Sequence, residues 1–205
     1  MANPGSIGIA KYRELWLADN ISTAAADGIA WVNSSDTGDT AFARAVAAGR
    51  GLHATGALAA TDDNLIELCG DSLVFYGQEG FGYLEVLFMV DSVAGLAFNI
   101  GLNDDSLETS NTLPAELATT TWTTNATTFV GLVYDVDATN DEVHCMWVDD
   151  DNDASTAIGD LRMKGAAPVA SKWAMARVEI QDRGSGNGVR AVFNFTQDGK
   201  SFEKV

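Results

Sequence analysis

A succession of short segments in which apolar and polar residues alternate constrains the fold of this chain more than any other feature. The alternation begins near residue 50 and continues to the C-terminus. A period of two is typical of β-strands that bury one face, and the segments are separated by turn-forming residues. The eight segments expected to form strands are residues 64–69, 71–77, 81–92, 95–104, 128–137, 142–149, 172–182 and 189–202. So many short strands with little helix predict an all-β chain folded as an antiparallel β-sandwich.

Two of these segments have patterns that predict where their side chains lie. In residues 128–137, one face carries Phe129, Gly131, Val133 and Asp135, and the other carries Val130, Leu132, Tyr134 and Val136. Residues 142–149 are apolar on both faces apart from His144. A strand that is apolar on both faces is covered on both sides, so we expect this strand to be central.

The N-terminal part of the chain lacks this pattern. We expect residues 1–30 to form an arm or docking segment, with a helical turn or two in "KYRELWLADN", and residues 31–205 to form the sandwich domain. Residues 39–51 fit either a helix or a strand. Residues 104–128 are rich in Thr and contain Pro114, so we expect a long loop that wraps an edge or carries a function.

Charge is distributed unevenly along the chain, whose formal net charge is −17. Residues 61–160 carry 20 acidic residues and no Lys or Arg, whereas residues 161–205 carry eight bases and four acids. An acidic surface repels phosphate, which argues against a nucleic-acid partner. We interpret the acidic segment as solvated surface; the alternative is a face for cations or for a basic partner.

Several classes of protein are disfavoured by the absence of their signals. No apolar run reaches the length of about 20 residues that spans a bilayer, so we expect no membrane partner. The first residues lack the basic and apolar regions of a signal peptide. Cys69 and Cys145 each lie in an apolar stretch, and we expect both to be buried free thiols.

Residues 147–153, "WVDDDND", form the densest acidic cluster. The aspartates with the spacing of calcium-loop ligands are Asp149, Asp151, Asp153 and Asp160. Ala154 occupies the position where an EF-hand loop needs Gly, and the twelfth position is not Glu. We therefore interpret the cluster as the end of a strand followed by a solvated turn, without a committed metal or other cofactor, and keep Ca²⁺ as the alternative.

Catalytic signatures are missing. A retaining glycosidase on this type of fold needs two carboxylates on one strand face, but Glu85 is followed two residues later by Leu87. His144 and Cys145 are neighbours in a strand and point to opposite faces. The Gly-rich "GSGNG" lies between two expected strands and predicts a hairpin turn, not a phosphate-binding loop. We expect no enzymatic activity.

Trp residues supply the remaining candidates for contact with a partner. Trp147 and Trp173 lie in expected strands, which places them in the core. Trp122 lies in the Thr-rich segment and is a candidate for ligand or partner contact. Its alternatives are a core plug and a ring that stacks on a sugar or on a neighbouring subunit.

The segments from about residue 80 to the C-terminus resemble two known classes of protein. "FGYLEVLFMVDSVAGLAFNIGLND" and "KWAMARVEIQDRGSGNGVRAVFNFTQDGKSF" resemble paired strands and the closing hairpin of concanavalin A-like jelly rolls. The same stretch, with "LPAELATTTWTTNATTFVGLVYDVDATND", resembles structural proteins of tailed bacteriophages. Residues 1–60 match neither pattern.

This resemblance implies a non-enzymatic virion structural protein, most simply a capsid decoration or head-appendage subunit. Such a protein is assembled in the host cytoplasm and adheres through its N-terminal region and loops. The implied partners are the major capsid protein or other virion proteins, together with sibling subunits in a homo-oligomer, in particular a trimer. The alternative is a carbohydrate-binding, lectin-like module with Trp122 as its platform and residues 149–153 as a cation-binding loop.

Overall fold

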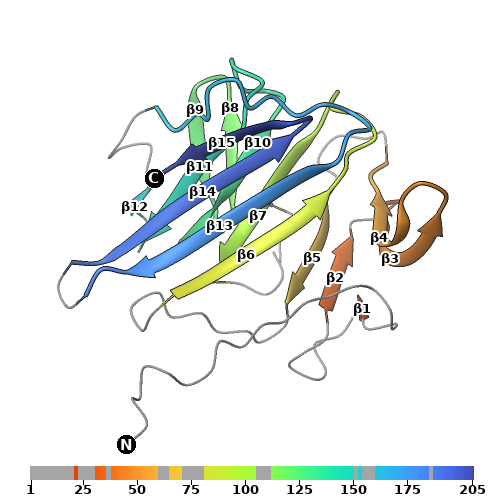
Figure 1. The fold of residues 1–205 in the computed structure, drawn as a ribbon, viewed down its shortest axis with the longest axis horizontal. Helices are drawn as coiled ribbons and strands as arrows, with labels where there is room; N and C mark the ends of the chain where they lie inside the picture. Colours follow the sequence, from red (N-terminus) through yellow and green to blue (C-terminus); the bar gives the residue numbers. More distant parts are fainter. Residues whose placement is uncertain are drawn as a thin grey trace, which may run out of the picture. The chain divides into compact units, whose positions relative to one another are not determined.

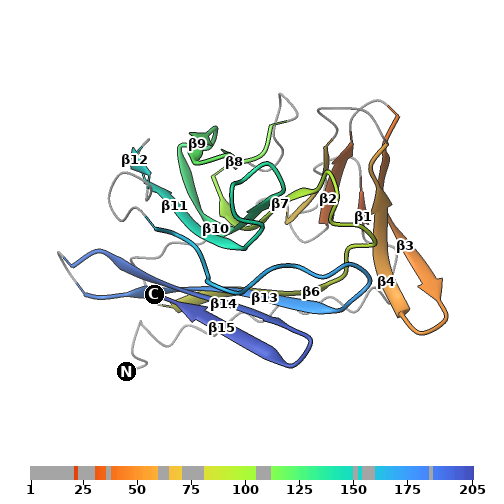
Figure 2. The same ribbon diagram turned by 90° about the horizontal axis from the view of Figure 1, so that it is seen from above.

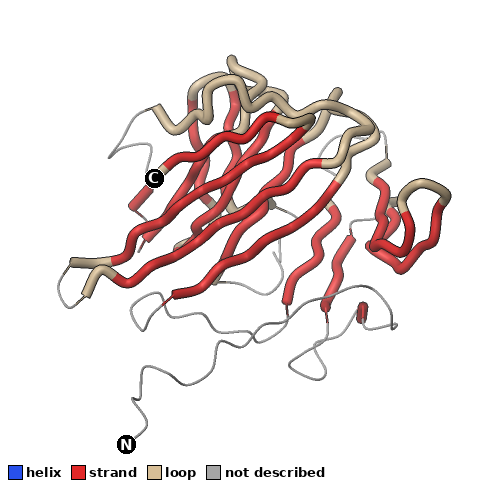
Figure 3. Tube along the Cα trace, in the orientation of Figure 1, coloured by secondary structure: helices blue, strands red, loops and turns tan. Residues whose placement is uncertain are grey.

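The computed structural model shows an all-β chain that divides into two compact units. It describes residues 21–22, 31–35, 38–59, 65–70, 81–104, 112–149, 152–153, 160–184 and 187–205 (Figure 3). These residues form strands, turns and loops but no helix, which confirms the expected class. Met1–Val74 with Asp105–Thr112 make up the N-terminal unit, and Phe75–Asp104 with Leu113–Val205 make up the C-terminal unit.

The N-terminal unit contains a small sheet and a hairpin (Figure 1). Strand β2 pairs in parallel with β1 and antiparallel with β5, and β3 pairs antiparallel with β4. The strands are β1 (Ile21–Ser22), β2 (Trp31–Ser35), β3 (Thr40–Ala47), β4 (Gly51–Ala57) and β5 (Ile66–Gly70). Residues 39–51, which fit either a helix or a strand, thus form a strand and a turn. The arm expected over residues 1–30 falls almost entirely outside the described residues, as do residues 71–77, and both stay predictions.

The C-terminal unit contains two four-stranded sheets in which every neighbouring pair is antiparallel. One sheet has the strand order β12-β11-β10-β7 and the other has the order β15-β14-β13-β6. Their strands are β6 (Phe81–Phe88), β7 (Ala97–Asn103), β10 (Thr128–Asp135), β11 (His144–Asp149), β12 (Asn152–Asp153), β13 (Ala174–Asp182), β14 (Val189–Gln197) and β15 (Lys200–Lys204). The strands expected from residue 81 onward are confirmed, with boundaries that shift by a few residues.

The two sheets lie face to face and share one hydrophobic core, here called the inner core (Figure 2). Its residues are Leu132, Val143, Cys145, Met163, Ala166, Ala174, Ala176, Val178, Phe193 and Phe195. Strands β10 and β11 contribute from one sheet, and β13 and β14 contribute from the other. Alternate residues of β13 are buried, as expected for a strand with one face in a core.

A second cluster, the outer core, covers the opposite face of β10 and β11. Its residues are Ala115, Ala126, Phe129, Val133, Met146, Val148 and Leu161, and Trp122 and Trp147 pack against it. The hairpin of β8 (Ala115–Ala118) and β9 (Thr121–Thr124) lies on this side as a third layer (Figure 2). Strands β10 and β11 are therefore buried on both faces, which confirms the central position expected for residues 142–149.

Two expectations about this region are wrong. The Thr-rich segment is not a continuous loop, because Ala115 and Leu117 alternate inward and form a strand that pairs with residues 121–124. Trp173 is 39% exposed and does not belong to the core. It precedes β13, whose alternation of buried residues begins at Ala174.

Two polar side chains fasten the β8–β9 hairpin to the central sheet. The Asn99 amide donates to the carbonyl of Ala115 at 3.0 Å and accepts from its N–H at 3.1 Å, as a neighbouring strand would. The buried Asp135 carboxylate accepts hydrogen bonds from the N–H groups of Leu117 at 3.1 Å and Asp137 at 3.0 Å. These bonds satisfy backbone groups that the short hairpin cannot pair within itself.

The Gly131→Ala substitution is expected to destabilise the C-terminal unit. A Cβ at Gly131 would lie 2.3 Å from Cζ of Phe129 and 2.9 Å from the carbonyl oxygen of Ile100. Relief of the first contact requires Phe129 to leave its place in the outer core, and relief of the second requires the β7 backbone to shift. We therefore expect a loss of about 1–3 kcal/mol in the free energy of unfolding. Urea denaturation measures it. Thr123→Ala, at an exposed position of β9, is the control and should change the value by less than about 0.5 kcal/mol.

Asp135→Leu is expected to lower the free energy of unfolding of the C-terminal unit more than Asp137→Leu does. It leaves the N–H groups of Leu117 and Asp137 without their acceptor, at an expected cost of about 2–4 kcal/mol. Asp137 is exposed, and among the described residues only its backbone forms hydrogen bonds. Asp137→Leu should therefore lower the free energy of unfolding by less than about 0.5 kcal/mol. Equal urea midpoints for the two variants would contradict the role given to Asp135.

Candidate functional site

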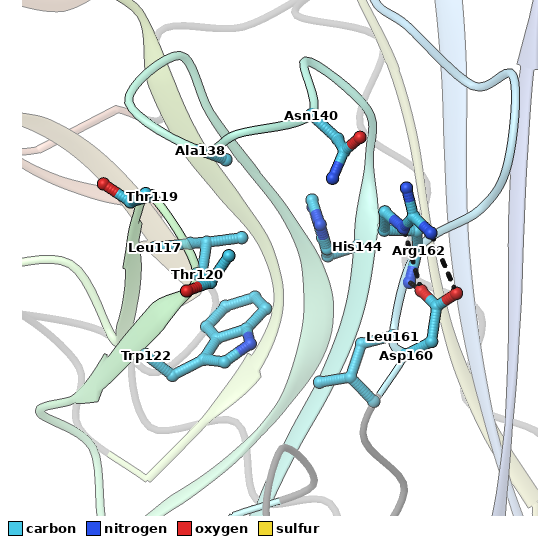
Figure 4. A pocket seen from close by; sticks show the side chains of 10 residues that line it. All are labelled: Leu117, Thr119, Thr120, Trp122, Ala138, Asn140, His144, Asp160, Leu161 and Arg162. Carbon is cyan, nitrogen blue, oxygen red and sulfur yellow. Dashed lines mark hydrogen bonds and ion pairs between the residues drawn. The ribbon is translucent and has the colours of Figure 1, made fainter.

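A small pocket opens between the β8–β9 hairpin and the N-terminal end of β11 (Figure 4). It has a volume of about 120 Å³. Its lining residues are Leu117, Thr119, Thr120, Trp122, Ala138, Asn140, His144, Asp160, Leu161 and Arg162. They come from the hairpin, from the connection between β10 and β11, from β11 itself and from residues 160–162. We call this site the His144–Trp122 pocket.

His144 forms one wall of the pocket. Its position in β11 opposite Val133 places it on the same face as Met146 and Val148 of the outer core. The imidazole meets the Trp122 indole edge to face, with 5.5 Å between ring centroids and an angle of 80° between planes. His144 is 5% exposed, and its imidazole lies within reach of the Glu142 backbone. Burial lowers the pKa of this imidazole below its ordinary value of 6.5, so His144 is neutral at pH 7.

An ion pair lies beside His144 on the same side of the pocket, because Arg162 pairs with His144 through the backbone. The Arg162 guanidinium donates from Nε to Oδ1 of Asp160 at 2.9 Å and from Nη2 to Oδ2 at 3.1 Å, as Figure 4 shows. These hydrogen bonds hold the pKa of the Asp160 carboxyl well below its usual range. Lys164 lies 3.7 Å from the same carboxylate, and Glu142 lies 3.8 Å from Arg162. The charges on this wall therefore compensate one another.

Backbone pairing holds this wall in place. The segment around Arg162 runs antiparallel to the start of β11, with Met163 N–H donating to Val143 O at 2.8 Å and Cys145 N–H donating to Leu161 O at 2.9 Å. The Lys204 ammonium group donates to the carbonyl oxygens of Asp160 and Arg162 and so ties the wall to β15. The pocket is thus lined largely by residues that belong to, or pair with, strands.

Of the candidate site residues, the structure brings Trp122 and Asp160 together in the pocket. Asp149 ends β11 and is exposed, and Asp153 belongs to β12, where it pairs with Val148. The described part of "WVDDDND" is therefore a strand end and the short strand that returns beside it. Asp151 lies outside the described residues.

Calcium binding at the Asp cluster, kept as the alternative to a solvated turn, stays untested. No group of three His, Cys, Asp or Glu side chains placed to hold a metal ion occurs in the described part of the chain. The Asp160 carboxylate already accepts two bonds from Arg162, so its nearest cation is a guanidinium.

Sequence reasoning missed His144, Asn140 and Arg162 as residues of a site. The signals were a lone His in an apolar strand and the first base after a long acidic segment. Neither signal reveals a pocket, because the residues that complete it come from strands and loops distant in the sequence.

The residues weighed as catalytic candidates, namely Cys145 with His144 and Glu85, are held apart from a partner or engaged in an ion pair. Cys145 lies in the inner core, where burial raises the pKa of its thiol to about 12, and His144 faces the other side of the sheet. Glu85 of β6 and Glu179 of β13 are far apart in the sequence. Their side chains lie on the same outer face of the two paired strands, and Arg177 bridges them. Arg177 lies between them, 3.1 Å from Glu85 and 3.0 Å from Glu179, and stacks over the Tyr83 ring. This arrangement resembles a structural ion-pair network.

Comparisons with protein-family models, with curated proteins and with solved structures each found no match. In addition, no helix that could cross a bilayer is found among the residues that the structure describes. Function is therefore inferred from the residues of this chain.

Stability is expected to fall as the pH decreases from 7.5 to 5.5, and His144 should cause part of this loss. The folded state depresses the pKa of His144, so the unfolded state binds its proton first and is favoured as the pH drops below about 6.5. Thermal unfolding measured across this range should show a smaller pH dependence for His144→Phe than for the unmodified chain.

His53, the other histidine, provides the matched control. It lies in β4 of the N-terminal unit, and its Nδ1 is 3.0 Å from the carbonyl oxygen of Gly51. His53→Gln should leave the pH dependence of the C-terminal unit unchanged. An unaltered slope in His144→Phe would show that His144 is not the group that titrates.

Proposed function

We propose that this chain is a non-enzymatic structural subunit of a tailed-bacteriophage virion. Its simplest role is that of a capsid decoration or head-appendage protein, assembled in the host cytoplasm and bound through its N-terminal region. The partners are the major capsid protein or other virion proteins and sibling subunits. The resemblance of residues 80–205 to phage structural proteins suggests this class, and the following observations support it.

The fold of the C-terminal unit is compatible with this role. Two antiparallel sheets share one core over the stretch that carries the resemblance. Within the proposal, this unit is a concanavalin A-like jelly roll, a rigid platform from which loops and an N-terminal segment reach partners. Rigid β-sandwiches of this kind serve many functions, so the fold alone does not select one.

The observation that carries the proposal is the shortage of buried apolar side chains among the described residues of the N-terminal unit. The two core clusters that the described residues form both lie in the C-terminal unit. Among the side chains that the structure describes in the N-terminal unit, only the polar Asn33 is buried. Val46 on the β3–β4 hairpin is 78% exposed, and Leu58 just after β4 is also exposed.

A unit of this kind gains stability by association. The β3–β4 hairpin contacts the small sheet of β1, β2 and β5. Small sheets of this kind with little buried apolar surface are marginally stable on their own. Docking on a capsid surface or on a sibling subunit would supply a further layer. Closed association of three copies would bury the same patch on each subunit without leaving a free edge.

Charge supports the choice of a protein partner over nucleic acid. Three bases of the C-terminal segment already pair with acids of the acidic segment, since Arg162 lies near Glu142, Lys164 near Asp160, and Arg177 near Glu85. The remaining excess of carboxylates repels phosphate backbones and would complement a basic patch on a capsid.

Immunogold labelling of virions tests the proposal directly. Antibodies against the purified chain should label particles of the phage that encodes it, and mass spectrometry of purified particles should detect the chain. In solution, light scattering should give the mass of a trimer. Absence of the chain from purified particles would refute the proposal.

A pair of variants tests whether the N-terminal unit makes the contact. Val46→Asp combined with Leu58→Asp should abolish trimer formation and particle binding while the C-terminal unit keeps its unfolding midpoint. Leu87→Asp, at a position of β6 that is 66% exposed in the C-terminal unit, is the control and should assemble normally. Normal assembly of the double variant would place the contact elsewhere.

A further inference from the structure

We propose that Asn187 is a site of spontaneous deamidation, at which the folded chain converts a side-chain amide into a carboxylate. The reactants are the backbone nitrogen of Gly188 and water, so no second protein is needed. This inference does not depend on the virion proposal. It rests on the pair Asn187–Gly188, on the exposure of this pair in the β13–β14 hairpin, and on a backbone N–H that bonds to no described residue.

The reaction joins the side chain of an asparagine to the backbone of the next residue. The Gly188 nitrogen gives up its proton and attacks Cγ of Asn187, a succinimide ring closes, and the amide nitrogen takes up the proton and leaves as ammonia. Water then opens the ring at one of its two carbonyl groups. One opening gives aspartate, and the other gives isoaspartate, in which the backbone runs through the former side chain. The sum is asparagine and water converted to aspartate or isoaspartate and ammonia.

Glycine after asparagine removes the main steric barrier to this attack, because it has no Cβ to crowd the approaching side chain. Asn187 is the only asparagine in the sequence that glycine follows. The surroundings are open as well, since a Cβ built on Gly188 would meet no heavy atom within 4 Å. The ring therefore has room to close.

The hairpin turn exposes this pair to water. Asn187 and Gly188 are both exposed and lie between the end of β13 at Asp182 and the start of β14 at Val189. The Asn187 amide donates to the carbonyl oxygen of Arg183 at 3.2 Å, at the long end of the usual range. An exposed side chain held by one long bond can rotate toward the Gly188 nitrogen, and water has access to the ring that forms.

The nucleophile is the backbone nitrogen of Gly188. The Arg183 N–H donates to the carbonyl oxygen of Gly188 at 3.2 Å, but the Arg183 carbonyl accepts from the Asn187 side chain in place of the Gly188 N–H. Among the described residues, the Gly188 N–H has no acceptor. A bonded N–H must break its bond before it can lose its proton, so the hairpin leaves this nitrogen ready to react.

Other asparagines of the C-terminal unit lack these features. Asn194 lies inside β14, and the residue after it is buried and paired with strands on both sides. The N–H of the residue after Asn125 donates to the carbonyl oxygen of Pro114 at 3.2 Å. In both cases the next residue also carries a Cβ. We therefore expect Asn187 to deamidate well before Asn194 or Asn125.

Deamidation changes the tip of the hairpin and leaves the cores intact. The carboxylate cannot donate to the Arg183 carbonyl, so that hydrogen bond is lost, and the chain gains one negative charge. Isoaspartate also lengthens the backbone within the turn. Neither core contains Arg183, Asn187 or Gly188, so we expect the deamidated chain to stay folded.

Peptide mapping of the purified full-length chain after incubation at pH 8 and 37 °C tests the proposal. Residues 184–190 form one tryptic peptide, in which Asn187 is the only amide side chain. Mass spectrometry should show this peptide converting to two products of equal mass that elute separately. The rate should exceed that at Asn194 by about tenfold or more, a difference of about 1.4 kcal/mol in activation free energy. It should also rise with pH, because the Gly188 nitrogen must lose its proton. Equal rates at Asn187 and Asn194 would overturn the proposal.

Two controls assign the reaction to the hairpin of the folded chain. Asn187→Gln keeps an amide but must close a larger ring, so conversion of this peptide should be abolished. A synthetic peptide of residues 184–190 gives the rate without the fold, and the folded chain should react within about tenfold of it. An Asn187 amide that persists in the folded chain while the synthetic peptide deamidates would overturn the proposal, because it would show that the hairpin protects the pair.

Discussion

The burial of β10 and β11 on both faces is the constraint on which the rest of the C-terminal unit depends. One face of these strands supplies the inner core that holds the two sheets together, and the other supplies the outer core that holds the β8–β9 hairpin. Gly101 and Gly131 face each other across β7 and β10, and the Phe129 ring lies close to both. Small residues at this point leave room for a large ring, and the three-layer arrangement follows from that packing.

Side-chain amides and a carboxylate complete the backbone pairing where strands end. Asn99 pairs with Ala115, and Asp135 accepts from Leu117, so the hairpin is fixed to the central sheet at two places. Gln197 does the same in the other sheet, where its amide bonds to both backbone groups of Val169 and to the carbonyl of Lys172. Each of these residues is partly or fully buried, so the bonds replace water that the backbone groups lose on folding. The same framework supports the walls of the His144–Trp122 pocket.

Strand β13 could be predicted from the sequence because its alternate residues are buried, and β11 because it is apolar on both faces. The β8–β9 hairpin could not, since four-residue strands rich in Thr carry little periodic signal and their burial depends on Phe129 and Met146 of other strands. Residues 39–51 were ambiguous because Ala and Arg suit a helix as well as a strand. The pocket could not be predicted from the sequence, because Trp122, His144 and Arg162 come together only once the three layers have formed. Trp122 was a candidate on its residue type alone.

The central claim is that the chain combines a C-terminal unit with two cores of its own and an N-terminal unit that completes its packing only in an assembly. Amide hydrogen exchange, measured residue by residue on the unassembled chain and then on the assembled form, tests it most directly. In the unassembled chain, β10 and β11 should exchange only through global unfolding, whereas β3 and β4 should exchange much faster through local opening. Assembly should slow exchange in β3 and β4 and leave β10 and β11 unchanged. Equal protection of β3 and β10 in the unassembled chain would contradict the account, because it would show that the N-terminal unit needs no partner.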